Sequence, residues 1–151
     1  ETAMLAEPYL KPHDKILIFN IDTFFKSDTL ENKLLSDPDG LVGCFKSRNK
    51  NYSYAKIEKG IVVQTAEKKL ISNDALTGLY YFKQFNYFSK SANYIFTKNI
   101  HVNSEYYIAP SYNYLISKGK KIIADRVKDI SIIGVPSDYE NYKKNPSKYI
   151  L

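Results

Sequence analysis

The segment KILIFNIDTFF, residues 15–25, constrains the fold more than any other stretch of this sequence. Four apolar residues, Ile16 to Phe19, run without a polar break, and such a run bounded by charged residues is typical of a buried strand. Asn20 and Asp22 follow directly. In open α/β sheets, ligands bind beyond the carboxyl ends of the strands. The segment therefore predicts a buried strand that ends at a ligand site containing the Asp22 carboxylate.

Strand and helix patterns interleave along the rest of the chain and predict one α/β domain, a mixed sheet with helices on its faces. The central hairpin requires some antiparallel pairing. Strands are expected at 15–20, 41–45, 54–58, 61–67, 75–82, 121–127 and 130–135. Helices are expected at 2–10, 28–36, 84–98, 109–118 and 137–144.

Local signals refine several of these elements. Asp28 or Thr29 is a candidate N-cap of the helix at 28–36, and Ser137 is a candidate N-cap of the last helix. Lys59-Gly60 separates two strand patterns and predicts a hairpin turn. Gly78 lies inside a strand pattern, which indicates a bulge or a close backbone approach.

Composition narrows the function classes. The net charge of +6 is explained either by a lysine-rich surface or by attraction of an anionic substrate such as a phosphate or nucleotide. Nucleic-acid binding is not expected, because arginine occurs only at Arg48 and Arg126 and no long basic block is present. The lone Cys44 excludes an internal disulfide and a cysteine-rich zinc site. No segment has the apolar length of a membrane span, so we expect no membrane association and a cytoplasmic location.

Four acidic or basic residues are candidates for chemistry. Asp22 at a strand end suits a Mg²⁺–nucleotide site, although a cap or turn role is an equal alternative. Glu67 and Lys68 lie at the end of the strand pattern at 61–67, where they could bind sugar hydroxyls and a phosphate, but the pattern alone favours solvated charges. Glu105 lies in a tyrosine-rich segment, which core packing also explains. No Walker or GxGxxG loop and no nucleophile motif occurs in the 151 residues.

The order of motifs resembles the nucleotidyltransferase (sugar-nucleotide pyrophosphorylase) family. The motifs are IFNIDTFF, then YSYAKIEKGIVVQTAEKKLISNDALTGLYYF, then NSEYYIAPSYNYLI and GVPSDYENY. The likeness is greatest to the branch associated with bacterial capsule and lipopolysaccharide precursors. It implies a mostly parallel, Rossmann-like mixed sheet. Because the family's glycine-rich nucleotide loop is absent, it also implies that residues 1–151 are the C-terminal portion of a single domain, inactive in isolation.

The resemblance assigns catalytic roles to two residues. Asp22 matches the aspartate that binds Mg²⁺, and Lys68 matches the lysine that reaches the sugar phosphate, with Glu67 beside it as a substrate ligand. The implied reaction is attack of the acceptor phosphate on the α-phosphate of a nucleoside triphosphate, with release of pyrophosphate. The implied partners are a nucleoside triphosphate and a sugar phosphate or related acceptor, and a homodimer is compatible with the family.

The resemblance also assigns substrate-binding roles to five other residues. Thr77 and Gly78 match the strand that lines the sugar pocket. Tyr54 and Ala55 match a step whose backbone approaches the acceptor, and Glu105 matches an acid that binds acceptor hydroxyls.

One position departs from the family pattern. Many relatives have a second metal-binding aspartate two residues before the glycine of the late motif, where this chain has Ile132. Asp129 is nearby but out of register, so the second metal ligand is not assigned.

Three alternative functions are weighed against this one. A non-catalytic module that binds sugar phosphate fits the missing nucleotide loop. A haloacid-dehalogenase-type phosphatase is disfavoured because Asn20 stands where the nucleophilic aspartate would be. A metal-dependent glycosyltransferase shares the general architecture, but the Glu67–Lys68 block argues against it.

Overall fold

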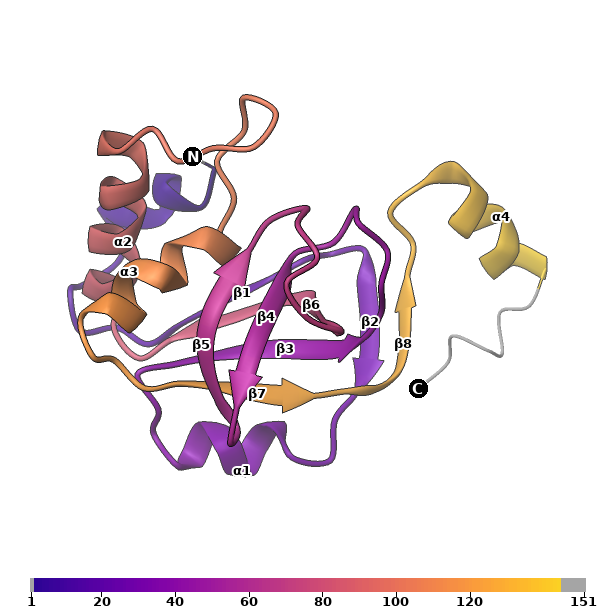
Figure 1. Cartoon of the computed structure of the whole chain (residues 1–151), viewed down its shortest axis with the longest axis horizontal. Helices are drawn as coiled ribbons and strands as arrows, with labels where there is room; N and C mark the ends of the chain where they lie inside the picture. The colour runs from indigo at the N-terminus through magenta and orange to yellow at the C-terminus, as the bar shows by residue number, and fades with distance from the viewer. Residues whose placement is uncertain (1, 145–151) are drawn as a thin grey trace.

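The computed structural model describes residues 2–144, and Figure 1 shows their arrangement. The strands are β1 (Ile16–Phe19), β2 (Thr23–Lys26), β3 (Gly40–Lys46), β4 (Tyr54–Glu58), β5 (Ile61–Ala66), β6 (Asp74–Phe82), β7 (Ile122–Arg126) and β8 (Lys128–Ile132). The helices are α1 (Leu30–Leu35), α2 (Phe85–Thr97), α3 (Tyr112–Ser117) and α4 (Pro136–Lys144), with 3₁₀ helices η1 (Thr2–Tyr9) and η2 (Ala109–Ser111). The predicted mixed α/β architecture is confirmed.

The sheet is mainly antiparallel, which corrects the expected parallel majority. Six strands follow the order β1-β6-β3-β7-β5-β4, and β2 and β8 form a separate antiparallel ribbon. Among the described strand pairs only β3–β7 is parallel. An additional pairing of β4 with β6, at Tyr54 and Ala75, partly closes the sheet on itself.

The strand predicted at 15–20 is present as β1, but the prediction that it is buried is wrong. β1 is the edge strand, paired with β6 on one side, and its residues alternate between partly buried and exposed. Leu17 is 52% exposed and Phe19 is 45% exposed. An apolar run shows that a segment is hydrophobic, but its burial depends on which elements lie against it.

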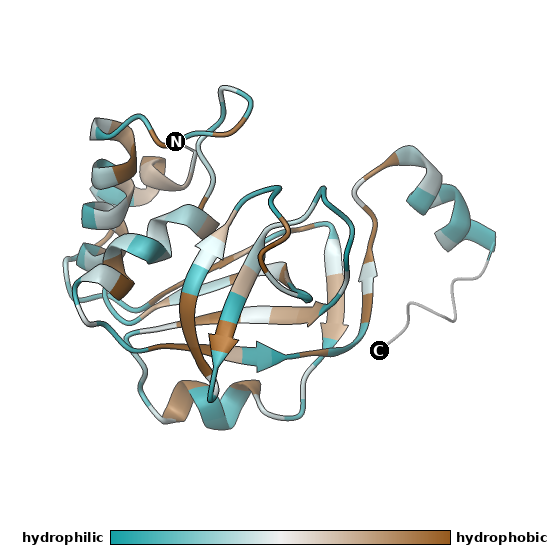
Figure 2. Cartoon of the chain, viewed as in Figure 1, coloured by the Kyte–Doolittle hydropathy of each residue, from teal (hydrophilic) through white to brown (hydrophobic). Residues whose placement is uncertain are grey.

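Two apolar clusters cover opposite faces of the sheet. On one face α2 and α3 pack on the strands, and the rings of Phe82 and Tyr112 stack with centroids 4.6 Å apart. The predicted stripe of α2 is confirmed, because Phe85, Phe88, Ala92 and Ile95 are all buried. On the other face α1 packs through Leu30 and Leu34 against a smaller cluster built on Leu41, Leu79 and Tyr81. Figure 2 shows that α4 is mainly hydrophilic, and Figure 1 shows it projecting beyond β8.

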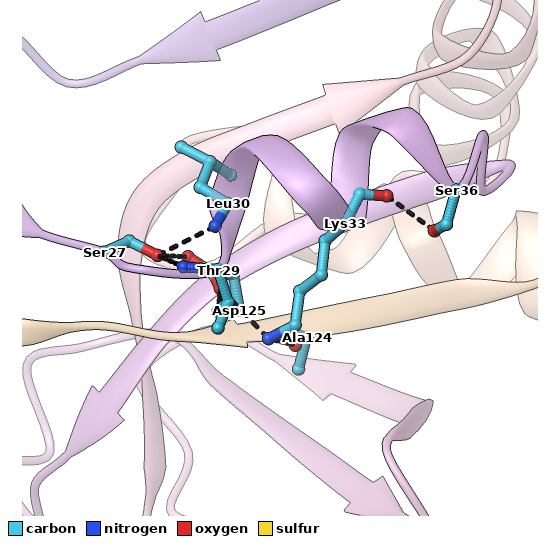
Figure 3. Close-up of polar contacts among 7 residues, drawn as sticks. All are labelled: Ser27, Thr29, Leu30, Lys33, Ser36, Ala124 and Asp125. Atoms are coloured by element: carbon cyan, nitrogen blue, oxygen red, sulfur yellow. Dashed lines mark hydrogen bonds and ion pairs between the residues drawn. The ribbon is translucent and has the colours of Figure 1, made fainter.

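A buried carboxylate fastens α1 to the sheet (Figure 3). Asp125 on β7 has no exposed surface and accepts hydrogen bonds from the hydroxyls of Ser27 and Thr29, each at 2.6 Å. Lys33 Nζ lies 3.0 Å from Asp125 Oδ1 and also donates to the carbonyl of Ala124. Burial alone would raise the pKa of Asp125, but these hydrogen bonds together lower it.

One of the two helix starts agrees with its predicted cap. Thr29 is the N-cap of α1, as predicted, but its side chain makes no capping hydrogen bond. The backbone N–H of Leu30 donates instead to Ser27 Oγ at 3.0 Å. The Asp28 carboxylate is instead paired with Lys128 at 2.8 Å. Ser137 lies inside α4, which begins at Pro136, a residue suited to the first helical position. Within residues 2–144 no helix combines the length and the apolar character that a bilayer crossing requires.

Candidate functional site

A cavity of about 390 Å³ opens where several loops meet the face of β6. Its walls come from the segment after β1, the segment before β4, the end of β5, the loop before η2 and the end of β8. The lining residues are Asn20, Asp22, Thr23, Asn51, Tyr52, Ser53, Glu67, Leu76, Thr77, Gly78, Tyr80, Tyr106, Tyr107, Ile108 and Ile132. A volume of this size suits a small polar metabolite.

Gly78 holds the segment after β1 against the floor of the cavity. Its φ of +88° is a conformation that glycine adopts freely, and its carbonyl accepts the backbone N–H of Asn20 at 3.2 Å. A Cβ placed on Gly78 would lie 2.4 Å from Asn20 Nδ2. The register of β3 against β6 shifts between Val42 and Cys44, where Gly78 bulges. The predicted bulge and close approach are both confirmed.

Asp22 lies on that segment, at the mouth of the cavity. Thr23 Oγ1 donates to Asp22 Oδ1 at 3.2 Å, and the Asp22 carbonyl accepts the N–H of Ile133 at 2.8 Å. Ile132, which the resemblance places at the position of a second metal ligand, also lines the cavity and pairs with Thr23 between β8 and β2. The ribbon therefore brings the two positions together, with a carboxylate just before β2 and an apolar side chain at the end of β8.

The residues of this site fit Mg²⁺ only as a site with a single protein carboxylate. Among residues 2–144 no group of three or more histidine, cysteine, aspartate or glutamate side chains could enclose a metal ion. Mg²⁺ is commonly held by one or two carboxylates, with waters and substrate phosphates completing its shell. Asp22 supplies one such carboxylate, so a metal at this position would depend on the substrate for further ligands.

Glu67 follows β5 and is nearly enclosed by the cavity wall. It is 8% exposed, and its Oε2 accepts a short hydrogen bond from the hydroxyl of Ser53. Burial raises the pKa of Glu67, while the Ser53 bond and the nearby charge of Lys68 act in the opposite direction. Tyr80 lies beside this pair, and its burial raises the pKa of its phenol. A carboxylate held in this way can accept hydrogen bonds from the hydroxyls of a bound ligand.

Lys68 and Glu105 lie beside the cavity and meet through Tyr107, which lines it. Lys68 Nζ donates to the Tyr107 hydroxyl at 2.7 Å, and the Tyr107 hydroxyl donates to Glu105 Oε2. The contact with Tyr107 is the main cause that raises the pKa of Lys68. No lysine, arginine or histidine appears among the described residues that line the cavity itself.

The structure brings together four of the predicted site residues, Asp22, Glu67, Thr77 and Gly78. Tyr54 and Ala55 are fully buried in β4 and do not line the cavity. Tyr54 instead donates from its hydroxyl to the carbonyl of Asn49 at 2.7 Å, which braces the loop before β4.

Sequence reasoning missed several lining residues. Alternation along β6 places Leu76, Gly78 and Tyr80 on one face, so this pattern could have predicted Tyr80 once Gly78 was chosen. Tyr52 and Ser53 adjoin the predicted Tyr54–Ala55 step, but no sequence signal distinguishes the residues that face the cavity from those that face the core.

Comparison with solved structures shows which fold this is. A nucleoside-diphosphate-sugar pyrophosphorylase from Vibrio cholerae RC9 superimposes with a TM-score of 0.80 and is 30% identical, over 95% of this chain and 62% of that one. The chain has the fold of the sugar-nucleotide pyrophosphorylases. A UDP-glucose pyrophosphorylase complexed with UDP-glucose matches with a TM-score of 0.70 and 18% identity, over 95% of this chain and 61% of that one. The inositol-1-phosphate CTP transferase from T. maritima matches with a TM-score of 0.66 and 16% identity, over 94% and 58%.

The predicted resemblance to the nucleotidyltransferases is thus confirmed. No family model matches the sequence, and no curated protein matches it. The chain spans about three fifths of the length of these pyrophosphorylases and transferases, with 58–62% of each covered.

Proposed function

We propose that the chain forms the acceptor-binding part of a nucleotidyltransferase. The enzyme would transfer a nucleoside monophosphate from a nucleoside triphosphate to a sugar phosphate, or to a similar phosphorylated acceptor, and release pyrophosphate. The observation that carries this proposal is the cavity, in which Asp22, Glu67, Thr77 and Gly78 converge on a fold shared with a 30% identical pyrophosphorylase. Residues 1–151 would be the C-terminal portion of that single domain.

Each residue has a distinct task in this proposal. Glu67, fixed by Ser53, accepts hydrogen bonds from the hydroxyls of the acceptor, and Gly78 lets Asn20 pack against β6, which holds the segment of Asp22 at the cavity. Lys68 binds the phosphate of the acceptor at the rim of the cavity. Its ammonium offsets the negative charge of that phosphate while the phosphate attacks the α-phosphate of the nucleotide in line. Asp22 would hold a Mg²⁺ ion, which when bound offsets the negative charge that develops on the phosphates.

The biological setting is a finer proposal, supported by the motif order of residues 52–82. We place the enzyme in the synthesis of bacterial capsule or lipopolysaccharide precursors. A homodimer, which rests on the resemblance, and a cytoplasmic location belong to the same proposal.

The test is pyrophosphate release by the complete protein, assayed with a panel of nucleoside triphosphates and sugar 1-phosphates in the presence of Mg²⁺. We expect turnover with at least one pair, and loss of turnover in Asp22→Asn with an unchanged melting temperature. The 151-residue chain alone, which contains no glycine-rich phosphate loop, should release no pyrophosphate. Full activity of Asp22→Asn would contradict the role of Asp22, and no turnover with any pair would contradict the transferase proposal.

A second candidate is a non-catalytic module that binds a sugar phosphate. Ile132 favours it, because this apolar side chain lines the cavity at a position where the resemblance implies a metal ligand. The same assay separates the two candidates, since a binding module would bind sugar 1-phosphate without releasing pyrophosphate in the complete protein.

A further inference from the structure

A hydrogen-bonded row of three side chains lies along the rim of the cavity. The ammonium of Lys68 lies 2.7 Å from the Tyr107 hydroxyl and 4.9 Å from the centroid of the Tyr107 ring. The same hydroxyl donates to the carboxylate of Glu105. The hydrogen bonds run in one direction, from the ammonium to the phenol hydroxyl and from that hydroxyl to the carboxylate. The Glu105 carboxylate therefore orients the Tyr107 hydroxyl so that its oxygen lone pairs face Lys68.

The loop that contains Glu105 and Tyr107 has a defined conformation. Val102 and Glu105 exchange two backbone hydrogen bonds of 3.0 Å each, and the two residues between them, Asn103 and Ser104, have φ of 51° and 63°. Two successive positive φ values are the signature of a tight type I′ turn. The turn ends at Glu105, two residues before Tyr107, and the side chains of these two residues are hydrogen-bonded.

Lys68 needs such support more than a buried lysine would. Its side chain is exposed, and a free lysine loses much rotamer entropy when it is fixed on a ligand. A tether that already restricts the side chain lowers this cost when a phosphate binds. The bond to Tyr107 uses one of the three N–H donors of the ammonium, which leaves two that can reach a phosphate.

We propose that Tyr107 is a positioning residue that holds Lys68 at the rim of the cavity, and that Glu105 acts on Lys68 through Tyr107 instead of on the acceptor hydroxyls. This inference rests on the proposed function, because it takes the phosphate of the acceptor as the ligand of Lys68. It reassigns Glu105, for which the resemblance implied direct acceptor binding. Glu105 accepts the Tyr107 hydroxyl through Oε2 and is not among the described residues that line the cavity, so its carboxylate acts on the lysine.

A double-mutant cycle on the 151-residue chain tests the proposal by calorimetric titration with glucose 1-phosphate. Tyr107→Phe should weaken binding about three- to tenfold, and Lys68→Met should weaken it by at least as much. In the Lys68→Met background, the further change Tyr107→Phe should have no effect, because a positioning residue acts only through its target. A merely structural role for Tyr107 would weaken binding in both backgrounds.

The matched control is a second lysine–tyrosine pair away from the cavity. Lys120 Nζ lies 2.8 Å from the Tyr87 hydroxyl and 4.4 Å from its ring centroid, so Tyr87→Phe removes the same kind of contact. It should leave the affinity for glucose 1-phosphate unchanged.

Two results would overturn the positioning role while leaving the proposed function intact. They are unchanged binding by Tyr107→Phe, and an equal loss on Tyr107→Phe in the wild-type and Lys68→Met backgrounds. Failure of the wild-type chain to bind any sugar 1-phosphate would overturn both proposals, and that result is distinguishable from the other two. Melting temperatures of all variants confirm that each is folded.

Discussion

Replacement of Asp125 by asparagine tests the network that fastens α1 to the sheet. The substitution keeps the shape of the side chain and removes its charge. In the native protein this carboxylate is fully buried and accepts hydrogen bonds from Ser27, Thr29 and Lys33 (Figure 3). The variant amide keeps a single acceptor oxygen for these three donors and adds two N–H groups that need partners.

The expected loss of stability follows from these contacts. A hydrogen bond to a charged group contributes about 1.5–3 kcal/mol, and one that is lost from a buried site is not replaced by water. The hydroxyls of Ser27 and Thr29 can rotate to accept from the amide, so the loss falls mainly on Lys33. We therefore expect Asp125→Asn to lower the free energy of unfolding by about 2–3 kcal/mol in urea titrations at pH 7. Asp28→Asn is the matched control, because Asp28 also pairs with a lysine but is exposed, and it should cost little.

The pH dependence gives the stricter test. The hydrogen bonds lower the pKa of Asp125 in the folded state below its unfolded value of about 3.9. Its contribution to stability is therefore complete above that unfolded value and disappears as the pH falls through the folded-state pKa. The difference in stability between wild type and Asp125→Asn should shrink in the same acid range. A loss no larger than that of Asp28→Asn, or a difference that does not change in acid, would refute the assignment.

Three further predictions concern the cavity and the core. Gly78→Ala should lower the free energy of unfolding by about 1–2 kcal/mol and also weaken sugar 1-phosphate binding, because the new Cβ would displace Asn20. Gly60 is the control: it has φ of 82° and open space around it, so Gly60→Ala should show the loss of stability alone. Cys44 is fully buried and burial raises the pKa of its thiol to about 12, so a thiol reagent at pH 8 should react only after unfolding, and rapid reaction with the folded chain would contradict its placement. Lys68→Ala should raise the Michaelis constant of the complete protein for the phosphorylated acceptor about tenfold, whereas Lys69→Ala should change it little, and the reverse ranking would contradict the register after β5.

The sequence predicted elements whose signals are local. The stripe of α2 repeats with helical spacing, and the Lys59-Gly60 turn joins β4 and β5 as expected, with both residues at positive φ. Gly78 predicted a close approach because only the absence of a Cβ explains a glycine in a buried strand. Each of these signals can be read from one residue or from residues a few positions apart, although the partner of Gly78, Asn20, lies far from it in the sequence.

Strand partners and burial could not be predicted in the same way. Nothing in the apolar run at 16–19 shows that β1 is an edge strand, because its exposure depends on what lies beside it. The ribbon of β2 and β8 joins segments about 100 residues apart and was missed. The same holds for the site, where the row from Lys68 to Tyr107 to Glu105 forms only when β5 and the loop before η2 meet.

Amide chemical shifts of the ¹⁵N-labelled chain, followed while glucose 1-phosphate is added, report directly on whether the cavity binds the acceptor. We expect saturable shifts for the amides of Glu67, Thr77 and Gly78, which surround the cavity, and none for the amides of α1 on the other face of the sheet. Saturable shifts confined to α1, or no saturable shift at all, would contradict the assignment of this cavity as an acceptor site.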